Sequence, residues 1–497
     1  MPEAIEIIRG TALLIKPEIF LLATVCALFL VGPLMVTDAG QAPAGLRHRW
    51  GVLSLIALVI AWIVWFRGGT ELVQGGMFRI DPLVWYVRGL SLTGGILLLL
   101  VLWNQIDDAH SAEVQACLLS IIVGTNLVAA ANDLVSMFLA LELVSIPTYV
   151  MLYLPRRDRV GSEATLKYFL LSVFSSAMVL YGMSWLYGVS GSTNFAAIRE
   201  VLSNRAPHAG EGMLEIAFAL LLAGLCFRIT AVPFHFYAPD VFQGTTAANA
   251  AMLSFVPKIV GFVALMRLIP LSGATEGWMQ WVPDHNAKLL LGAIAVMTMF
   301  LGNLMALRQK HLYRLMAYSS IAHAGYMLIG LAVGDVLPVG GREAILFYLA
   351  TYGLMTIGVF ALLSAAGTLG HPLETDADIR GLSRTQPVIA LLLAICLFSL
   401  TGLPPTAGFL GKLNLFLAAW SDTSTVGHYL AMFMAINAAI GAYYYLRLVA
   451  LMFLEPSTDT SGESHRARWA PWLAGTACAI ATIVIFVMPQ WLWDSIR

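Results

Sequence analysis

Residues 134–154 read LVSMFLALELVSIPTYVMLYL, an apolar run in which Glu142 is the only charged side chain. A helix of about 20 apolar residues is needed to cross the hydrocarbon core of a bilayer. The run ends in Pro155, which is followed at once by Arg156 and Arg157. We therefore interpret this stretch as a membrane-spanning helix with an acidic side chain near its middle.

The whole chain has the composition of this run. Hydrophobic residues make up 59% of its 497 positions and charged residues only 11%, whereas soluble proteins carry about 25% charged residues. The net charge is −1, and no basic tail indicates nucleic-acid binding. We therefore expect the lipid bilayer to surround most of the surface.

Further apolar runs predict an all-α integral membrane fold with about fourteen transmembrane helices. We place them at 17–36, 50–66, 81–103, 114–131, 134–154, 162–189, 213–233, 246–269, 287–306, 312–334, 343–368, 386–420, 427–453 and 469–490. With these spans the basic clusters of the loops all fall on one side, which the positive-inside rule makes cytoplasmic. Both termini are then predicted on the other side. The clusters are Arg47, His48 and Arg49; Arg156, Arg157 and Arg159; Arg308, Lys310, His311 and Arg314; and Arg466 and Arg468.

Proline interrupts two of these spans. The seventh runs into Pro233, and the twelfth contains Pro404 and Pro405 between Gly402 and Gly408. Proline removes a backbone donor and clashes with the preceding turn, so both helices should be discontinuous. Because the breaks lie five spans apart, we predict two inverted five-helix repeats, as in many transporters; incidental kinks are the alternative. The predicted parts are 1–112 (helices 1–3), 113–270 (first repeat), 286–455 (second repeat) and 466–497 (helix 14).

The cysteines give no indication of a cofactor in this chain. They lie singly in apolar stretches, and no CxxC motif is present, so an iron–sulfur, zinc or disulfide framework is unsupported. The N-terminal residues 1–16 include Glu3 and Glu6 but no small-residue cleavage site. We therefore expect the sequence to start with the mature chain. The cysteines are Cys26, Cys117, Cys226, Cys396 and Cys478.

A few ionisable side chains lie within or beside the predicted spans. A charge at the bilayer centre costs about 2.5–3.5 kcal/mol on insertion scales, so it is expected to be paired, hydrated or functional. We predict that these side chains handle protons. They are Glu142, Lys167, Arg228, His235, Lys258, His323 and Lys412.

Glu142 and Lys167 are predicted to form a switch. The loop charges place the fifth and sixth spans antiparallel, which brings these two side chains to similar depth. A cation within about 4–6 Å would keep Glu142 ionised, and separation would let it take a proton. The alternative is a static ion pair that only fixes helix packing.

The remaining groups are predicted relay sites. Desolvation favours the neutral form of a buried lysine, which applies to Lys258 and Lys412. Histidine as a residue type exchanges protons near neutral pH, which makes His235 and His323 further candidates. The alternatives are a lysine that reaches the membrane interface, which suits Lys412 better than Lys258, and histidines that only pack.

Several motifs of the chain together resemble the antiporter-like subunits of respiratory complex I, most closely the subunit N type. The resemblance covers about residues 80–455 and is carried by specific strings. These are Asn132-Asp133-Leu134 with 141–147 (LELVSIP), 167–171 (KYFLL) with 174–177 (FSSA), 232–235 (VPFH) with 239–244 (PDVFQG), 318–326 (YSSIAHAGY), and 402–405 (GLPP) with 408–412 (GFLGK).

The resemblance implies a proton-translocating membrane-arm subunit of a complex I-like NADH-quinone oxidoreductase in the inner membrane of a bacterium. Glu142 and Lys167 would be the coupling pair, Lys258 the central relay and Lys412 the residue near the exit. NADH, FMN, iron–sulfur clusters and quinone would be bound by other subunits, and the partners would be the other membrane-arm subunits.

One position departs from the family pattern. The family usually has a lysine in the seventh helix where this chain has Arg228. Because arginine does not deprotonate in proteins, we expect Arg228 to act as a fixed charge, with protons reaching Lys258 through water.

Two other functions remain open on sequence alone. A multisubunit sodium/proton antiporter uses the same scaffold, and a purely structural membrane subunit would use its buried charges only to hold helices together.

Overall fold

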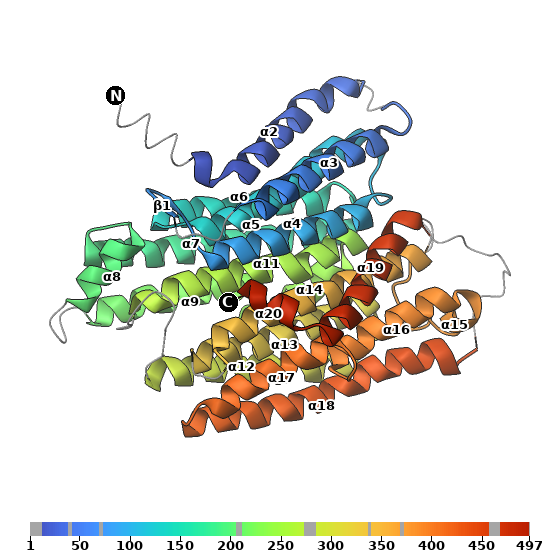
Figure 1. Cartoon of the computed structure of the whole chain (residues 1–497). Helices are drawn as coiled ribbons and strands as arrows, with labels where there is room; N and C mark the ends of the chain where they lie inside the picture. Colours follow the sequence, from blue (N-terminus) through green and yellow to red (C-terminus); the bar gives the residue numbers. More distant parts are fainter. Residues whose placement is uncertain are drawn as a thin grey trace. The chain divides into compact units, whose positions relative to one another are not determined.

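The computed structural model describes residues 12–37, 42–68, 73–204, 211–272, 285–335, 339–367, 372–456 and 468–496. Within these residues, twelve helices are long and apolar enough to cross a membrane. The predicted all-α membrane fold is therefore confirmed (Figure 1). Glu3, Glu6 and Arg466 lie outside the described residues.

The chain forms two compact units, the first of which comprises residues up to Leu99, Ile106–Arg228 and Val256–Ala274. Its helices are α2 (Lys16–Val31), α3 (Leu46–Phe66), α4 (Pro82–Leu102, in this unit up to Leu99), α5 (Ser111–Ala130), α6 (Leu134–Tyr153), α7 (Arg159–Ser190), α8 (Phe195–Ser203), α9 (Glu211–Arg228) and the second half of α11 (Ala247–Leu268). Short 3-10 turns lie at Pro33–Met35, Asp108–His110 and Ile269–Ser272. Strands β1 (Val73–Gly75) and β2 (Phe78–Ile80) form an antiparallel hairpin in the register Val73↔Ile80.

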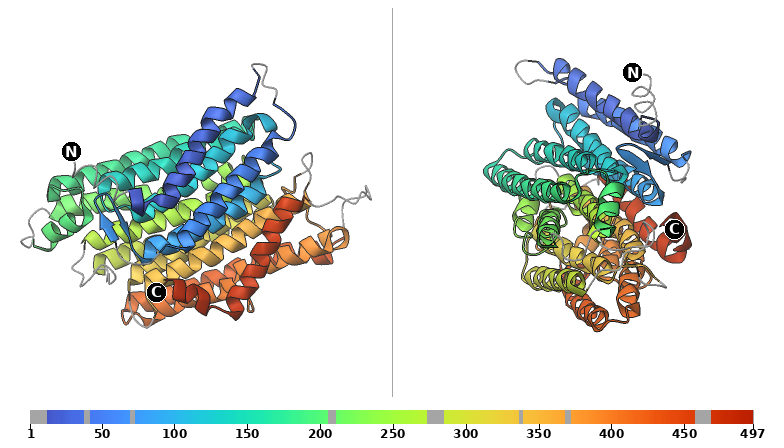
Figure 2. Two further views of the ribbon diagram at one scale, coloured as in Figure 1. Left: turned by 45° about the horizontal axis from the view of Figure 1, so that its top comes forward. Right: turned by 90° about the vertical axis from the view of Figure 1, so that its left-hand side faces the viewer.

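The second unit comprises Leu100–Gln105, Ile229–Phe255 and the residues from Thr275 onward. Its helices are α10 (Ala238–Gln243), the first half of α11, α12 (His285–Leu307), α13 (Leu312–Val333), α14 (Gly341–Ala366), α15 (Leu382–Thr385), α16 (Pro387–Thr401), α17 (Ala407–Ser421), α18 (Thr425–Leu454), α19 (Trp469–Val487) and α20 (Gln490–Ile496). Figure 2 shows these helices from two further sides.

Small residues let the helices of each unit approach closely, as is common in membrane proteins. In the first unit, a Cβ on Gly224 of α9 would lie 2.8 Å from the Ser175 carbonyl oxygen of α7. In the second, a Cβ on Gly302 of α12 would lie 2.6 Å from the Ala322 backbone nitrogen of α13. Neither helix pair can therefore accept a larger residue at these positions without separating.

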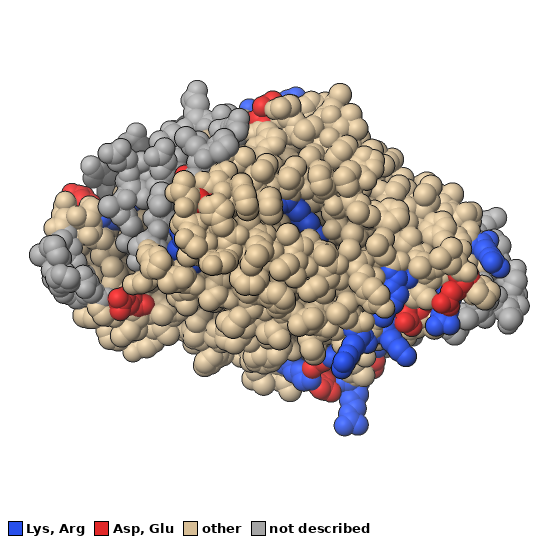
Figure 3. Space-filling model, turned by 90° about the horizontal axis from the view of Figure 1, so that it is seen from below, with Lys and Arg blue, Asp and Glu red and all other residues tan. Residues whose placement is uncertain are grey.

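The second unit is built around α13. All residues in the apolar stretch of α13 are buried, whereas only 44% of those in α12 and 39% of those in α18 are buried. Large apolar side chains such as Leu304 and Tyr443 are exposed on these outer helices, as expected for surfaces that face lipid. In Figure 3 the middle of one face of the molecule carries mostly uncharged residues, and the charged side chains gather toward its edges.

The structure contains both predicted helix breaks. At the seventh predicted span, α9 ends at Arg228 and the chain is irregular until α10 begins at Ala238. At the twelfth, α16 ends at Thr401 and α17 begins at Ala407. The interrupted backbone is hydrogen-bonded by neighbours, because Val232 N–H donates to Thr298 Oγ1 at 3.0 Å and Gly408 N–H to Ser399 Oγ at 3.0 Å. The breaks are therefore built parts of the fold.

Candidate functional site

Glu142 is held near the middle of α6 by partners from two other helices. Asp133 caps the start of α6 by accepting from Ser136 N–H, which fixes where the helix begins. About two turns further along, α6 carries Glu142. Its Oε1 accepts a 2.5 Å hydrogen bond from Ser176 Oγ of α7. The same oxygen lies 3.3 Å from Arg228 Nη2 of α9.

Arg228 is fixed more firmly than Glu142. Its Nη1 donates to Ser145 Oγ at 2.9 Å and to the Leu141 carbonyl at 3.4 Å. Only 7% of its side chain is exposed, against 24% for Glu142. Arg228 is also the last residue of α9, where the negative end of the helix dipole favours a cation. The guanidinium is therefore a permanent positive charge aimed at Glu142.

Lys167 has a different position from the one expected. Its Nζ lies 2.8 Å from Glu163, one turn earlier on α7, and its side chain is 41% exposed. Nine positions separate Lys167 from Ser176, the α7 residue that contacts Glu142; this is about 13.5 Å along a helix and half a rotation around it. The geometry therefore corrects the expected pairing, since it favours Arg228 over Lys167 as the partner of Glu142.

Lys258 and His235 lie in contrasting surroundings. Lys258 follows Pro257 in the middle of α11, and none of its surface is exposed. His235 lies in the irregular segment between α9 and α10, is half-buried, and its carbonyl accepts from Ala238 N–H at 3.1 Å. Of these two residues, Lys258 has the fully buried position that we predicted for a relay group, and His235 does not.

His323 lies at the centre of a tyrosine cluster in the second unit. Its Nδ1 is 2.6 Å from Tyr348 Oη of α14, and its Nε2 is 3.0 Å from Tyr445 Oη of α18. Tyr445 Oη is also hydrogen-bonded to Ser319 Oγ. Because a phenol both donates and accepts, each ring nitrogen has a partner with which a proton can be exchanged.

Lys412 is bound at the helix break next to this cluster. Its Nζ donates to the Leu400 and Thr401 carbonyls at 2.9 and 2.8 Å. These are the last two residues of α16, whose carbonyls have no partner within their own helix. The ammonium also lies 5.2 Å from the centre of the Tyr326 ring, a cation–π distance. The break therefore provides a cation site, not only a kink.

Side chains that the sequence analysis did not single out connect these groups. Asn303 donates to Tyr326 Oη at 3.1 Å and accepts from Tyr444 Oη at 3.0 Å. The Tyr444 and Tyr445 ring centres are 4.4 Å apart, and Tyr445 contacts His323. A buried polar network thus runs from the ring beside Lys412 to His323.

A buried ion pair of the second unit was also missed. Lys288, at the start of α12, lies 2.6 Å from Asp422, which follows α17. Burial opposes ionisation of Asp422, but hydrogen bonds from Lys288 and from the Ser424 backbone outweigh it and keep the pKa of Asp422 below its usual value. Both residues lie at the edges of predicted spans, where the sequence shows no sign that they meet.

Gly402 is the residue that lets the break accommodate Lys412, and we expect Gly402→Ala to destabilise the protein. Gly402 has φ +87°, and an added Cβ would lie 2.9 Å from Lys412 Cδ. A left-handed conformation costs a non-glycine residue about 1–2 kcal/mol. Thermal unfolding of the purified protein in detergent should show a lowered midpoint.

The matched control for this prediction is Gly188→Ala. Gly188 lies in α7, and an added Cβ there meets nothing within 4 Å. Alanine is the better helix former, so the midpoint should stay unchanged or rise. Equal midpoints for the two variants would contradict the role given to Gly402.

Within the described part of the chain, no three His, Cys, Asp or Glu side chains gather closely enough to hold a metal ion. The buried groups combine a fixed charge, Arg228, with side chains that can gain or lose a proton, such as Glu142 and His323, and this combination is suited to binding and transferring protons.

The chain is similar to known proteins over most of its length. Residues 131–441 match the family described as NADH:quinone oxidoreductase/Mrp antiporter, TM. The sequence is 34% identical over 493 residues to NADH-quinone oxidoreductase subunit N of Anoxybacillus flavithermus, which covers 96% of this chain and 94% of that protein.

Two solved structures resemble the fold closely. A chain of respiratory complex I from Thermus thermophilus superposes with a TM-score of 0.78 at 28% identity, covering 97% of this chain and 99% of that chain. A chain of the Mrp complex from Dietzia sp. superposes with a TM-score of 0.78 at 19% identity, covering 97% of this chain and 96% of that chain. The second likeness concerns the fold alone.

Proposed function

The chain belongs to the NADH:quinone oxidoreductase/Mrp antiporter family, and from that membership we propose that it is the N-type proton-translocating subunit of a complex I-like NADH-quinone oxidoreductase. Relatives that match nearly its full length are named NADH-quinone oxidoreductase subunit N. The chain would be a subunit of a translocase and contribute no redox centre itself.

The observation that carries this proposal is the ion pair between half-buried Glu142 and buried Arg228. A carboxylate and a guanidinium 3.3 Å apart attract each other by about 5 kcal/mol at an effective dielectric constant of 20. Protonation of Glu142 removes that attraction, while Arg228 keeps its charge. The proton occupancy of one carboxylate therefore sets the field felt by nearby titratable groups.

We propose a direction of transfer from the other placements. Lys258 would be the central relay, since it is fully buried. His323 would pass protons through Tyr348 and Tyr445, and Lys412 would release them near the exit. Arg228 would tune its neighbours without carrying a proton, and water would bring protons to Lys258. His235 and Lys167 would act at the margins, because both are more exposed.

The names of its relatives support a proposal for the setting of the subunit. We propose that NADH, FMN, iron–sulfur clusters and quinone are bound by partner subunits, and that the neighbours of this chain are the other membrane-arm subunits. The membrane would be the inner membrane of a bacterium, with both termini on the non-cytoplasmic side. We also propose that residues 113–270 and 286–455 are inverted repeats, each with one discontinuous helix.

An antiporter subunit is the second candidate, because the fold is shared with a chain of the Mrp complex. The two differ in energy source. A tagged chain should co-purify with subunits that reduce quinone with NADH, migrate with them in a native gel, and acidify vesicles only when NADH is supplied. Sodium/proton exchange without NADH, together with an assembly that lacks quinone reductase activity, would overturn the proposal in favour of the antiporter.

A further inference from the structure

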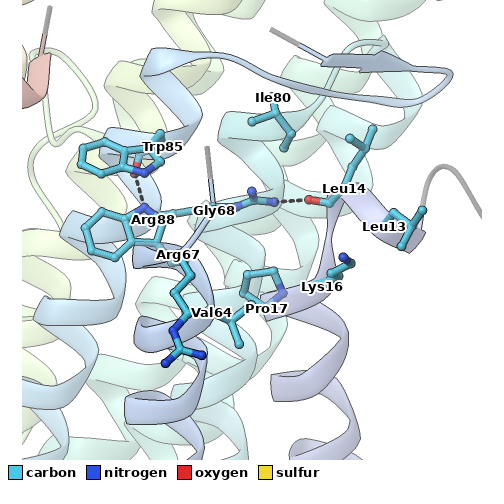
Figure 4. A pocket seen from close by; sticks show the side chains of 11 residues that line it. Leu13, Leu14, Lys16, Pro17, Val64, Arg67, Gly68, Ile80, Trp85 and Arg88 are labelled. Atoms are coloured by element: carbon cyan, nitrogen blue, oxygen red, sulfur yellow. Dashed lines mark hydrogen bonds between the residues drawn. The ribbon is translucent and has the colours of Figure 1, made fainter. Parts of the chain in front are cut away.

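A pocket of about 460 Å³ lies in the first unit between the start of α2, the end of α3 and the start of α4. Its walls combine cationic side chains with tryptophan and aliphatic residues (Figure 4). Neither the proton-handling groups nor the proposed function uses it.

The pocket has an excess of positive charge. Lys16, Arg67 and Arg88 line it. Arg88 is neutralised by the buried carboxylate of Glu18, at 2.8 and 3.0 Å, and in Figure 4 it reaches across to the Leu14 carbonyl at 2.8 Å. Lys16 and Arg67 are exposed, and among the described residues neither forms an ion pair. Among the described residues at the pocket, three cations thus face one anion, and two positive charges remain for a ligand.

Aromatic residues place this pocket at the level of lipid headgroups. Trp65 Nε1 donates to the Trp85 carbonyl at 2.8 Å, and the two rings lie 4.7 Å apart. Trp62 stacks on Phe66 in the same turn of α3. Tryptophan is enriched at the boundary between hydrocarbon and water, where the phosphates of a bilayer also lie.

An exposed apolar surface continues from the pocket along the two helices. On α2, Ile19 and Phe20 are 42% and 38% exposed, and on α3, Ile60, Ile63 and Val64 are 38%, 41% and 37% exposed. Acyl chains attached to a headgroup in the pocket would cover these side chains. A phospholipid site needs cations that bind the phosphate and an adjoining apolar surface that the acyl chains cover, and this region has both.

We propose that this pocket binds the headgroup of an anionic phospholipid, with its phosphate between Lys16 and Arg67 and its acyl chains along α2 and α3. A zwitterionic headgroup carries its own cation and would leave the two positive charges uncompensated. The two exposed cations attract a headgroup with net negative charge more strongly than a zwitterionic one.

The test uses the full chain, purified with its accompanying subunits and washed in detergent. Native mass spectrometry measures retained and re-added phosphatidylglycerol in the wild type and in Lys16→Gln and Arg67→Gln. An exposed ion pair contributes up to about 1 kcal/mol, so each variant should bind up to about fivefold more weakly. The matched control is Arg49→Gln, which removes an exposed cation near the start of α3 and should bind like the wild type.

Competition with added ligands distinguishes a lipid headgroup from free inorganic phosphate as the occupant of the pocket. Phosphatidylcholine should bind more weakly than phosphatidylglycerol, and inorganic phosphate at equal ionic strength should not displace the lipid. Equal binding of the two lipids, displacement by inorganic phosphate, or equal losses in Arg49→Gln and Arg67→Gln would each overturn the proposal. So would a cryo-electron microscopy map of the wild-type assembly in which a protein side chain fills the pocket.

Discussion

Replacement of Glu142 by glutamine is expected to slow proton pumping strongly while the assembly and its electron transfer to an artificial acceptor remain. Glutamine keeps the shape of the side chain and can accept from Ser176 and Arg228, whose atoms lie 2.5 and 3.3 Å from Glu142 Oε1. It cannot ionise, so Arg228 has a permanently neutral neighbour. We expect an initial rate at least about tenfold lower, which corresponds to about 1.4 kcal/mol, in vesicles energised with NADH and followed with a pH-sensitive dye.

Glu200→Gln is the matched control for this variant. Glu200 is an exposed carboxylate on α8, and its loss should leave pumping unchanged. Intact assembly with an unchanged pH gradient in Glu142→Gln would instead show that the buried charges only hold helices together.

Arg228 gives the reciprocal test of the same pair. Arg228→Lys keeps a cation at the end of α9 and should retain a substantial part of the pumping rate. Arg228→Gln leaves Glu142 without its charged partner and should lose most of it. Normal pumping by the glutamine variant, measured in the same NADH-energised vesicles, would exclude the electrostatic role given to Arg228.

The membrane fold and its breaks follow from local chemistry and were predictable for that reason. An apolar run of spanning length has no alternative to a helix in lipid, and the prolines at 233, 404 and 405 prevent a continuous one. Both signals are contained within a single helix. The helix starts at His285 and Thr425 and the gap between Arg228 and Ala238 agree with the proposed spans to within a few residues.

The partner of Glu142 depends on packing and was not predictable in the same way. Sequence position gives the depth of a side chain in the membrane but not the direction in which it points around its helix. Lys167 and Ser176 share α7, yet Ser176 meets Glu142, while Lys167 pairs with Glu163. Loop charges fixed which helices are antiparallel without fixing how each is rotated.

The tyrosine network was missed for a related reason. Aromatic residues in apolar helices usually pack as hydrophobic side chains, and nothing local distinguishes a tyrosine whose hydroxyl has a partner. Tyr445 meets His323 across 122 positions of the chain, and Asn303 meets Tyr444 across 141. Only the packing of α12, α13 and α18 creates these contacts. Along the sequence, the polar side chains that precede His323 are Tyr318, Ser319 and Ser320, and of these Ser319 shares Tyr445 with His323.

Lys412→Met is expected to stop proton transfer through the second unit. Methionine has a similar length, but it carries no charge and cannot donate to the Leu400 and Thr401 carbonyls, which now accept from Lys412 at 2.9 and 2.8 Å. The negative end of the α16 dipole would then have no cation beside it. We expect NADH-driven acidification of vesicles to fall at least about tenfold, which corresponds to about 1.4 kcal/mol.

Lys412→Arg separates the charge of this residue from its proton. Arginine can bind the same carbonyls and keep the cation, but it does not release a proton in proteins. If Lys412 is a relay, the arginine variant should assemble normally and still pump poorly, whereas Lys310→Met, which removes an exposed loop lysine, should pump like the wild type. Wild-type pumping by Lys412→Arg would show that Lys412 acts only as a fixed charge, as Arg228 does. In that case protons would have to leave by groups other than Lys412, and the hydroxyl and amide network around His323 would be the remaining route in the described part of the second unit.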